Sequence, residues 1–509
     1  MRTMAEAARA EQIRQLRSRG ISEVDAIRQT HTGTQSADNE TVGAPSTDHT
    51  AESGEPEDAD SATSPDDVEG SPDRQSDRQF VIVTQDFTGL GWAKKLTEEG
   101  ETVTLALDNP EDDSKDAKLF DQVGHGWLKT MPLKQAMAEL QSDSTYWVFA
   151  ENCFIDAAEK LIKAGQRVFG TSTLSERMEH DRAYAVGVAE ACGLGSPATE
   201  SFATVDEGVA FLDEHGETAY VFKPDSSEFN HLTFVPGRVG DADANRELAA
   251  YLAHIADNPG PYILQERLPK ADVLEVNVEV WLYEGQPLLA VLGLELKRKD
   301  TGDLGEMAGC AGDFMQLIPL DSPLVKQTVG LMLPFYKDEK YTGTADVNCL
   351  ITPDGVPHFL EVCDRLGYNA HVTMLLGLLE DGQVGQLIAD FTDGVVDGMA
   401  ERFKKGVAGS LTLFLDHPRP GLPLHIDDRY TEQFYPFDGY KEDDTLLLTG
   451  YSNEIGILVQ YGATIEAATA ALYARMNEEA VACPDSYWRT DVGEGPGKRM
   501  ADLKRRKLL

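Results

Sequence analysis

A β-hairpin near residue 350 constrains the fold of this chain more than any other stretch. Residues 343–352 and the run that begins at His358 read as two strands, separated by residues 353–357, which contain Pro353 and Gly355. Proline at the second position of a turn and glycine at the fourth suit a type I β-turn. The chain is therefore expected to build an antiparallel sheet around this hairpin.

The polar residues of the hairpin can gather on one face of that sheet. Because side chains alternate between the faces of a strand, Asp346 and Asn348 share one face, and Glu361 and Cys363 share a face of the partner strand. Arg365 follows just beyond the second strand. Carboxylate and amide oxygens are ligands of Mg²⁺, which shares the rest of its shell with nucleotide phosphates. The pattern favours a magnesium–nucleotide site; the alternative is an edge hairpin whose polar face is only solvated.

The hairpin resembles the metal-binding end of the ATP-grasp ligases, and the wider sequence looks most like phosphoribosylamine–glycine ligase. That family ends the second strand with Glu-x-Asn-x-Arg-x-Gly, where this chain has Glu361, Arg365 and Gly367 but Cys363 in place of Asn. The resemblance implies Glu361 and Cys363 as metal positions and Arg365 as a catalytic residue. Strand parity adds Asp346 as a second carboxylate for the metal. The implied cofactors are ATP and Mg²⁺, with Mn²⁺ as a substitute.

Length and composition limit the class of protein. A chain of 509 residues is long enough for about three compact units. Its six cysteines are far apart and form no Cys-x-x-Cys pair, which argues against a zinc module or a disulfide framework. No apolar run approaches the roughly 18 residues of a membrane span, so we expect a cytoplasmic protein without a membrane partner. The net charge of −42 argues against nucleic-acid binding and suits a salt-rich cytoplasm.

The first part of the chain is expected to lie outside the folded core. Residues 1–30 read as a short helical prefix around Gly20, which favours a protein-binding arm over a helix-turn-helix because its second helix has almost no basic residues. Residues 31–78 are rich in Ser, Thr, Asp, Glu, Gly and Pro. Such a segment cannot bury enough apolar surface to fold, so we predict a disordered acidic linker.

Residues 79–172 alternate short apolar runs with helical patterns, which predicts a Rossmann-like parallel sheet. The expected strands are 80–84, 102–107, 145–149 and 167–169, and the expected helices are 92–99, 133–141 and 153–164. The loop after the first strand contains Thr88, Gly89 and Gly91. At a helix N-terminus it could hold a phosphate on its backbone amides, or it could be an ordinary tight turn. In the resembling family this loop meets the phosphoribosyl substrate.

Residues 173–395 resemble the ATP-grasp domain, a core of two α+β lobes. Arg182 lies near the entry to this domain, where the family has a basic residue for the phosphates. Lys223 ends an apolar strand and matches the lysine of the α-phosphate; a buried ammonium is costly unless an anion meets it. The strand at 262–268 resembles the adenine hinge, and the next strand carries a carboxylate near the ribose. The implied ATP-binding residues are Arg182, Lys223, Gln265, Glu266, Leu268 and Glu275.

Two loops of this domain depart from the family. The segment at 226–232, which would cover the phosphates, contains no glycine. The stretch 297–309 keeps a basic pair and Asp-Thr-Gly, which implies Lys297, Arg298 and Asp300 as catalytic residues at the acyl-phosphate end. A cationic run in an acidic chain points to a phosphate or carboxylate partner, and its alternative is a solvated surface loop.

Residues 375–395 read as one helix, residues 396–495 as a small β-rich C-terminal domain, and residues 496–509 as a solvated basic tail. The fold class is therefore α/β, and the resemblance covers about 80–495. It implies a ligase that joins glycine to phosphoribosylamine in purine biosynthesis. Two alternatives stay open: the same chemistry on another carboxylate and amine, or a non-catalytic nucleotide-binding scaffold. The second alternative rests on the glycine-free loop and on Cys363, because a thiol is a poor ligand for Mg²⁺.

Overall fold

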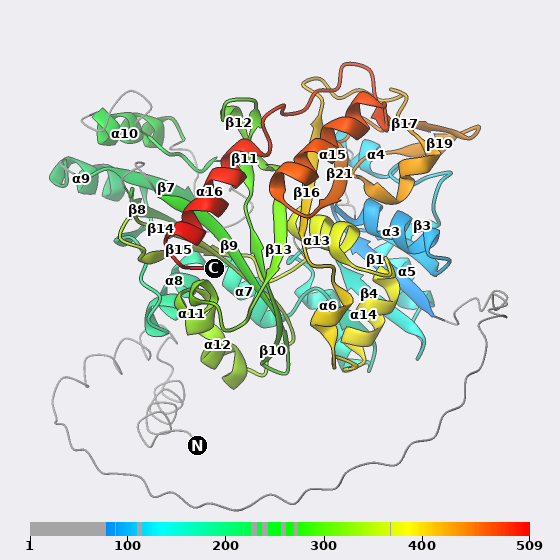
Figure 1. The fold of residues 1–509 in the computed structure, drawn as a ribbon, viewed down its shortest axis with the longest axis horizontal. Helices are drawn as coiled ribbons and strands as arrows, with labels where there is room; N and C mark the ends of the chain where they lie inside the picture. Colours follow the sequence, from blue (N-terminus) through cyan, green and yellow to red (C-terminus); the bar gives the residue numbers. More distant parts are fainter. Residues whose placement is uncertain are drawn as a thin grey trace, which may run out of the picture. The chain divides into compact units, whose positions relative to one another are not determined.

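The computed structural model describes residues 78–509, apart from residues 87, 109–114, 217, 225–231, 237–242, 256–260, 269–272 and 367. The predicted helical prefix, the linker up to residue 77 and most of the glycine-free loop lie outside the described residues. Labels follow Figure 1. No helix within the described ranges is long and apolar enough to cross a bilayer.

The first sheet of the described chain is parallel, as predicted. Its strand order is β3-β2-β1-β4-β5. The strands are β1 (Gln79–Thr84), β2 (Thr102–Leu107), β3 (Thr130–Pro132), β4 (Thr145–Phe149) and β5 (Arg167–Phe169). The helices between them are α3 (Thr88–Glu98), α4 (Lys115–Phe120), α5 (Leu133–Glu139) and α6 (Ile155–Lys163). The unbroken apolar run of β1 is buried because helices cover both faces of the sheet.

Helix α3 begins four residues earlier than predicted, so the expected phosphate loop is its first turn. The Thr88 backbone N–H donates to Asp86 Oδ1 at 2.7 Å, and the Gly89 N–H donates to Thr84 Oγ1 at 3.2 Å. The glycines allow close packing: a Cβ on Gly91 would lie 2.4 Å from the Tyr435 ring. These glycines therefore allow α3 to pack closely against its neighbours. A glycine-containing loop that permits close packing and one that binds phosphate look alike in the sequence.

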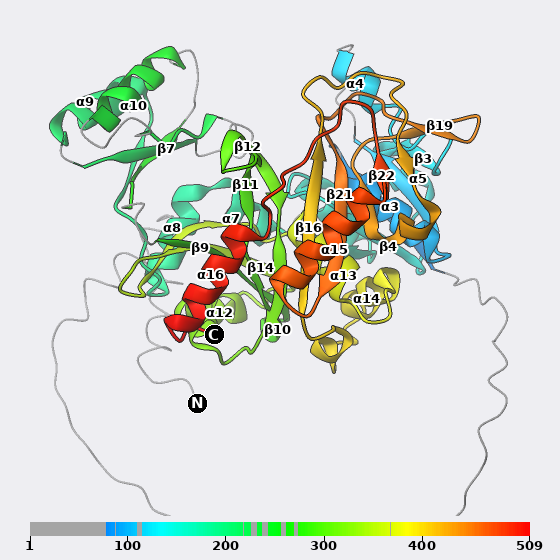
Figure 2. The same ribbon diagram turned by 45° about the horizontal axis from the view of Figure 1, so that its top comes forward.

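A small antiparallel sheet follows two connecting helices, α7 (Thr173–His180) and α8 (Arg182–Ala191). Its strand order is β6-β8-β7, and two helices pack on it around Phe222 and Tyr262. The strands are β6 (Thr199–Phe202), β7 (Tyr220–Pro224) and β8 (Tyr262–Glu266), and the helices are α9 (Val205–Glu214) and α10 (Ala244–His254). Figure 2 shows these helices beyond β7, on the side away from the large sheet.

The large sheet has the order β15-β14-β9-β10-β13-β16-β21-β18 and contains the predicted hairpin as β14 and β15. Its strands are β9 (Leu274–Tyr283), β10 (Gln286–Gly293), β13 (Phe314–Ile318), β14 (Gly343–Ile351), β15 (Pro357–Val362), β16 (Val407–Phe414), β18 (Phe434–Pro436) and β21 (Glu454–Gly462). The turn is closed by the Gly355 N–H, which donates to the Thr352 carbonyl at 2.8 Å. The boundary predicted at 395/396 thus falls between strands of one sheet.

Helices cover both faces of this sheet. A Cβ on Gly377 of α13 (Ala370–Leu378) would meet Ala408, whereas Gly409 faces Ala468 of α15 (Ile465–Asn477). Because neighbouring strand residues point to opposite faces, α13 and α15 lie on opposite faces. The predicted helix 375–395 is two helices, since the chain turns at Gly382 before α14 (Val384–Thr392). Helices α11 (Pro323–Gln327) and α12 (Val329–Asp338) precede β14.

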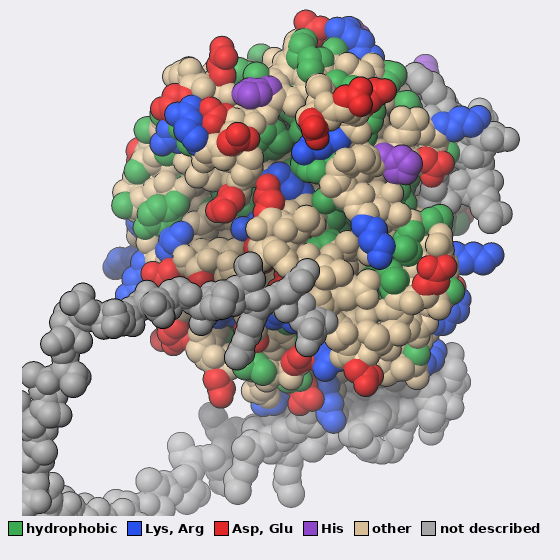
Figure 3. All heavy atoms as spheres, turned by 90° about the vertical axis from the view of Figure 1, so that its right-hand side faces the viewer, with side chains coloured by type: hydrophobic (Ala, Val, Ile, Leu, Met, Phe, Trp, Pro, Cys, Tyr) green, Lys and Arg blue, Asp and Glu red, His purple; other side chains and the backbone are tan. Residues whose placement is uncertain are grey.

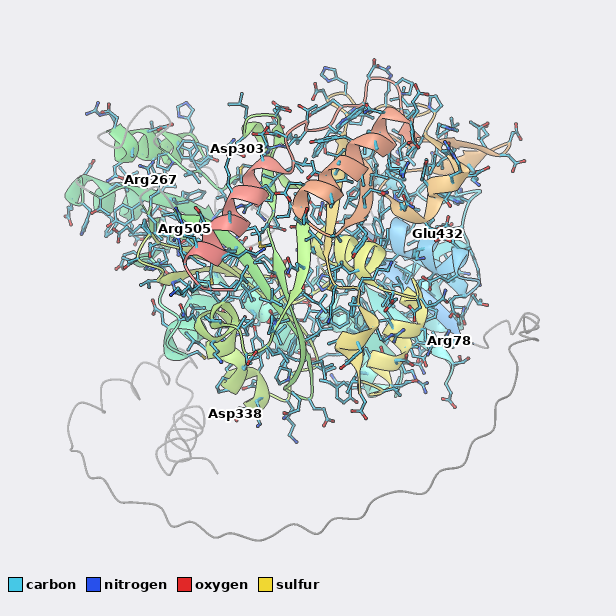
Figure 4. The ribbon with its side chains drawn as sticks, in the orientation of Figure 1. Arg78, Arg267, Asp303, Asp338, Glu432 and Arg505 are labelled. Atoms are coloured by element: carbon cyan, nitrogen blue, oxygen red, sulfur yellow. The ribbon has the colours of Figure 1, made fainter. Side chains whose placement is uncertain are left out.

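Two further predictions of irregular structure are corrected. The stretch 297–309 is a hairpin of β11 (Leu296–Asp300) and β12 (Leu304–Gly312), with Asp303 at its tip (Figure 4). The basic tail forms helix α16 (Glu494–Arg505). This helix buries Pro496, Met500 and Leu503, whose spacing puts them on one helix face despite the charged residues around them. The remaining short strands are β17 (His425–Ile426), β19 (Tyr440–Glu442), β20 (Thr445–Leu447) and β22 (Val481–Ala482).

Candidate functional site

A row of polar side chains crosses three strands of the large sheet. Glu361 of β15 is paired with Asn348 of β14, and Asn348 is paired with Asn277 of β9. Directly paired residues of antiparallel strands project from the same face. The register therefore brings a carboxylate and two amides together, as the hairpin pattern predicted for Glu361 and Asn348.

Glu361 lies among positively charged side chains. Arg182 Nη1 donates to Glu361 Oε2 at 3.2 Å, and Lys223 and Lys297 lie near the same carboxylate. Burial alone would raise the pKa of Glu361, but the charges of Arg182, Lys297 and Lys223 lower it to about 2. The side chain of Glu361 is 33% exposed. The site therefore presents an ionised, accessible carboxylate within a ring of cations.

Lys297 connects this ring to a second group of carboxylates. Its ammonium pairs with Glu295, and the charges of Glu295, Glu361 and Glu275 raise its pKa although burial acts against it. Glu275 is half-buried on the same face of β9 as Asn277, and burial raises its pKa. Arg499 of α16 donates to the Glu275 carbonyl at 2.9 Å and to the Glu295 carbonyl at 2.6 Å. The C-terminal helix thus fixes the backbone on both sides of this part of the site.

The predicted adenine-hinge residues lie on or just after the central strand of the small sheet. Gln265 of β8 is buried, and its Nε2 donates to Thr199 Oγ1 at 3.1 Å. Ile263 is paired with Lys223 of β7, so Gln265, two residues further on, shares its face. Glu266 and Leu268 are half-buried at the end of this strand.

The face of the small sheet that carries Ile263 meets the hairpin across a pocket. Its lining comes from helices α7 and α8, strand β8 and strand β15, and includes Met178, Glu179, Arg182, Ile263, Glu361 and Cys363. Small-molecule sites are commonly concave and lie between the lobes of a domain. The geometry makes this pocket the candidate ligand site.

A second acidic pair lies deeper on the same face. Asp346 is paired with Glu279, and both are almost completely buried, at 3% and 0% exposure. Burial and the Glu279 charge raise the pKa of Asp346 well above its usual range. His371 Nε2 lies 3.2 Å from Glu279 Oε1. The buried Glu279 carboxylate and the loss of solvent both disfavour the charged form of Asp346, which weakens it as a metal ligand.

The hairpin offers oxygen ligands to a nucleotide-bound divalent metal ion. Within the described ranges, no three His, Cys, Asp or Glu side chains are arranged around one metal position. A nucleotide-bound Mg²⁺ needs only one or two protein ligands, which Glu361 and the adjacent Asn348 can supply. Burial and Glu179 raise the pKa of Cys363 well above its usual range. Its thiol stays protonated, so the donor set fits Mg²⁺ through Glu361 and Asn348 rather than through Cys363.

The other predicted catalytic residues are spread over two places. Arg365 Nη2 pairs with Glu179 at 3.1 Å, close to the pocket. Arg298 Nη1 donates to the Gly305 carbonyl at 2.7 Å, and Asp300 is exposed near the tip of the β11–β12 hairpin. The structure therefore brings Lys297 to Glu361 but leaves Arg298 and Asp300 at the hairpin, because successive strand residues point apart.

Sequence reasoning missed two residues of this site and ranked a third too low. Asn348 was one of three candidates for the missing metal oxygen, with Asp346 preferred, whereas the register places Asn348 opposite Glu361. Glu295 could have been found, since it lies two residues before Lys297. No residue close to Arg499 in the sequence indicates that it belongs to the site. It reaches the carbonyl of Glu275 only because α16 folds back beside β9.

Lys223 gives the site a testable pH dependence. Burial and the nearby Arg182 lower the pKa of Lys223 to about 8, so its ammonium loses charge as the pH rises through that value. We expect the affinity for ATP to fall about tenfold between pH about 7 and about 9, measured by calorimetry. Lys223→Arg should remove this fall, since a guanidinium keeps its charge. A flat pH profile of the unchanged protein would contradict the role of Lys223.

The chain is similar in sequence and in fold to proteins that are already known. No family model matches the chain. The chain is 22% identical over 362 residues to phosphoribosylamine–glycine ligase of Halalkalibacterium halodurans, covering 66% of this chain and 78% of that protein. It is 25% identical over 357 residues to the ligase of the same name from Corynebacterium ammoniagenes, covering 66% and 79%.

Solved structures extend the likeness. Phosphoribosylamine–glycine ligase from Thermotoga maritima has a TM-score of 0.59 at 17% identity, covering 81% of this chain and 99% of that one. Biotin carboxylase from Campylobacter jejuni has a TM-score of 0.57 at 13% identity, covering 82% and 94%. The protein thus has the ATP-grasp fold, with a parallel sheet and a large antiparallel sheet, and its sequence is similar at low identity to phosphoribosylamine–glycine ligases.

Proposed function

We propose that this protein is an ATP-dependent ligase that joins a carboxylic acid to an amine through an acyl phosphate. The observation that carries the proposal is the ionised Glu361 carboxylate among Arg182, Lys223 and Lys297, beside the pocket. The solved Campylobacter jejuni relative is a complex with β-γ-ATP, and a carboxylase domain from Hydrogenobacter thermophilus holds MgADP. Scattered free cysteines are consistent with action in the cytoplasm.

The reaction follows from these charges. An oxygen of the substrate carboxylate attacks the γ-phosphorus of ATP, and the bond to the bridging oxygen breaks to release ADP. Arg182, Lys223 and Lys297 offset the negative charge on the transferring phosphoryl group. Mg²⁺ at Glu361 and Asn348 would add further positive charge to the phosphates. The amine nitrogen then attacks the acyl carbon, phosphate leaves with the bonding electrons, and the nitrogen loses a proton.

The relatives' name gives the first substrate pair, glycine and phosphoribosylamine, which would place the protein in purine biosynthesis. A second candidate is the same chemistry on another pair. It is favoured by the loop after β1, where Asp86 accepts the Thr88 N–H that a substrate phosphate would need.

Turnover by the full-length protein tests the proposal. The purified chain is incubated with ATP, Mg²⁺ and pairs of carboxylates and amines, and the release of ADP and phosphate is measured. We expect release that needs both substrates. Release with glycine and phosphoribosylamine alone would select the first pair. No release with any pair, together with no ATP binding in calorimetry, would overturn the proposal.

A further inference from the structure

A buried asparagine of the parallel-sheet region reaches the segment that carries Arg365. Asn152 lies just after β4 and is 2% exposed. Its Nδ2 donates to Glu179 Oε2 at 2.9 Å and to the Asp364 carbonyl at 3.3 Å. Because a carboxylate and a carbonyl only accept hydrogen bonds, the amide nitrogen must face these two groups.

The amide oxygen of Asn152 is bound as well. Thr171 Oγ1 donates to Asn152 Oδ1 at 2.8 Å, and Ser175 Oγ donates to the same atom at 3.0 Å. Ser175 lies in the first turn of α7, and Thr171 lies between β5 and α7. Four hydrogen bonds therefore fix the plane of this amide between β4, α7 and the end of the hairpin.

Glu179 passes this order on to Arg365. Its Oε2 accepts the Asn152 amide, and its Oε1 pairs with Arg365 Nη2 at 3.1 Å. The side chains of Glu179 and Arg365 are only 13% and 21% exposed, so salt screens their pair less than a surface pair. Glu179 also lines the pocket. A chain of three side chains thus leads from β4 to the guanidinium beside the pocket.

The backbone around Arg365 has contacts that do not depend on Asn152. The Asp364 carbonyl also accepts the Tyr341 hydroxyl at 3.2 Å, and the Arg365 carbonyl accepts the Thr344 hydroxyl at 3.1 Å. A change at Asn152 therefore removes a support of the Glu179 side chain while the Asp364 and Arg365 carbonyls keep these bonds. The effect on Arg365 orientation can be separated from the effect on folding.

Two carboxylate–guanidinium pairs adjoin the pocket. One is Glu179 with Arg365, and the other is Glu361 with Arg182 at 3.2 Å. A carboxylate that is not held in place is free to turn toward another cation, and Glu179 lines the same pocket as Arg182, three residues further along the chain. Holding Glu179 on Arg365 keeps the two pairs separate, which preserves the arrangement of cations around the phosphoryl group.

We propose that Asn152 is a positioning residue: it holds Glu179 on Arg365 and thereby directs the Arg365 guanidinium at the pocket. Asn152 acts through Glu179 and makes no contact with a substrate. The catalytic consequence of this inference rests on the proposed ligase function. The orientation of Arg365 does not, so it can be measured separately.

Asn152→Asp tests the inference in turnover. The substitution keeps the size of the side chain and an acceptor for Thr171 and Ser175, but it removes the donor and sets a carboxylate against Glu179. We expect kcat to fall about tenfold or more, the loss of a hydrogen bond to a charged group. ATP affinity should change little, since Lys223 and β8 are untouched.

Gln166→Leu is the matched control, because Gln166 is another hydrogen-bonded amide of the same region. Its Oε1 accepts the Ser142 N–H at 3.1 Å and Trp147 Nε1–H at 3.3 Å. This variant should lower the midpoint of thermal unfolding and leave kcat unchanged. Equal kcat values in Asn152→Asp and Gln166→Leu would overturn the inference.

A second substitution decides whether Asn152 acts through Glu179. Adding Glu179→Gln to Asn152→Asp supplies an amide that can donate to the new carboxylate, so kcat of the double variant should exceed that of Asn152→Asp alone. Losses that simply add would contradict the route through Glu179. Acidic and basic side chains are interspersed on the face in Figure 3, and the net charge is −42, so about 0.5 M KCl is used to screen surface effects.

A crystal structure of Asn152→Asp separates the positioning role from the ligase. We expect Glu179 to be turned away from Arg365, with their hydrogen bond lost. A pair retained at its native 3.1 Å would overturn the inference even if turnover falls. A displaced pair, together with no turnover by the unchanged protein, would keep the positioning role of Asn152 and reject the ligase.

Discussion

Glu361→Gln is expected to lower the rate of ADP formation about 100-fold or more, in line with the loss of one preorganised electrostatic group in an active site. The substitution keeps the size of the side chain and removes its charge. Glu361 has two roles in the proposal: it holds the metal with Asn348, and it orients Arg182 through the 3.2 Å ion pair. Its pKa of about 2 means that the native carboxylate is charged throughout the working pH range.

The measurement is a coupled assay of ADP release with saturating substrates, repeated over a range of Mg²⁺ concentrations. Glu380→Gln is the control, since Glu380 is exposed and lies beyond the end of α13. Thermal unfolding should be little changed in either variant, because Glu361 is partly exposed. Full turnover of Glu361→Gln at low Mg²⁺ would remove both the metal assignment and the catalytic role of the hairpin.

Asp364→Ala is expected to have the largest effect on stability. Asp364 is 1% exposed, its Oδ2 accepts the Tyr336 hydroxyl at 2.7 Å, and its Oδ1 accepts the Asp346 N–H at 3.2 Å. Alanine leaves both donors buried without an acceptor, at a cost of about 1–3 kcal/mol each. The midpoint of thermal unfolding should fall by about 5 °C or more.

The matched change is Asp354→Ala in the turn of the same hairpin. Asp354 is exposed and accepts a hydrogen bond from the Thr352 hydroxyl at 2.6 Å, so its loss should shift the midpoint by little. Differential scanning calorimetry gives the unfolding midpoint of each variant. The comparison contrasts Asp364, just beyond the end of β15, with Asp354 in the turn between β14 and β15. Equal midpoints would mean that the Tyr336 and Asp346 donors find other acceptors, and that Asp364 does not anchor the segment leading to Arg365.

The hairpin shows how far local pattern reaches. The alternation of side chains along a strand predicted which face of the hairpin carries Glu361 and which carries Asn348. The turn residues predicted where the two strands are connected. Both predictions depend only on residues that are close in the sequence. The parallel sheet could also be predicted from the sequence, since the apolar runs of β1 and β4 alternate with helical patterns. These features make the ATP-grasp fold recognisable although the identity to its relatives is only 21–25%.

The ends of elements and the partners of charged residues could not be predicted in the same way. From sequence, Thr88 is predicted to lie in a loop, but in the structure Asp86 accepts its N–H at the start of a helix. The tail is predicted to be solvated, but Met500 and Leu503 are buried. A charged side chain gives no sign of its partner, which lies far away in the sequence. Arg182 and Glu361 are 179 residues apart, and Arg499 and Glu275 are 224 apart.

The sequence alone predicted the parallel sheet and the hairpin, because these follow from periodicity and turn chemistry, whereas the candidate residues of a nucleotide site follow from the resemblance to the ATP-grasp ligases. Only the tertiary structure decided which residues meet: it set Asn348 opposite Glu361, buried Asp346 beside Glu279, and put a carboxylate at the edge where a phosphate was expected. The physical reason is that burial and the distance between charges govern ionisation and ligand choice. Neither quantity exists before strands distant in the sequence are paired.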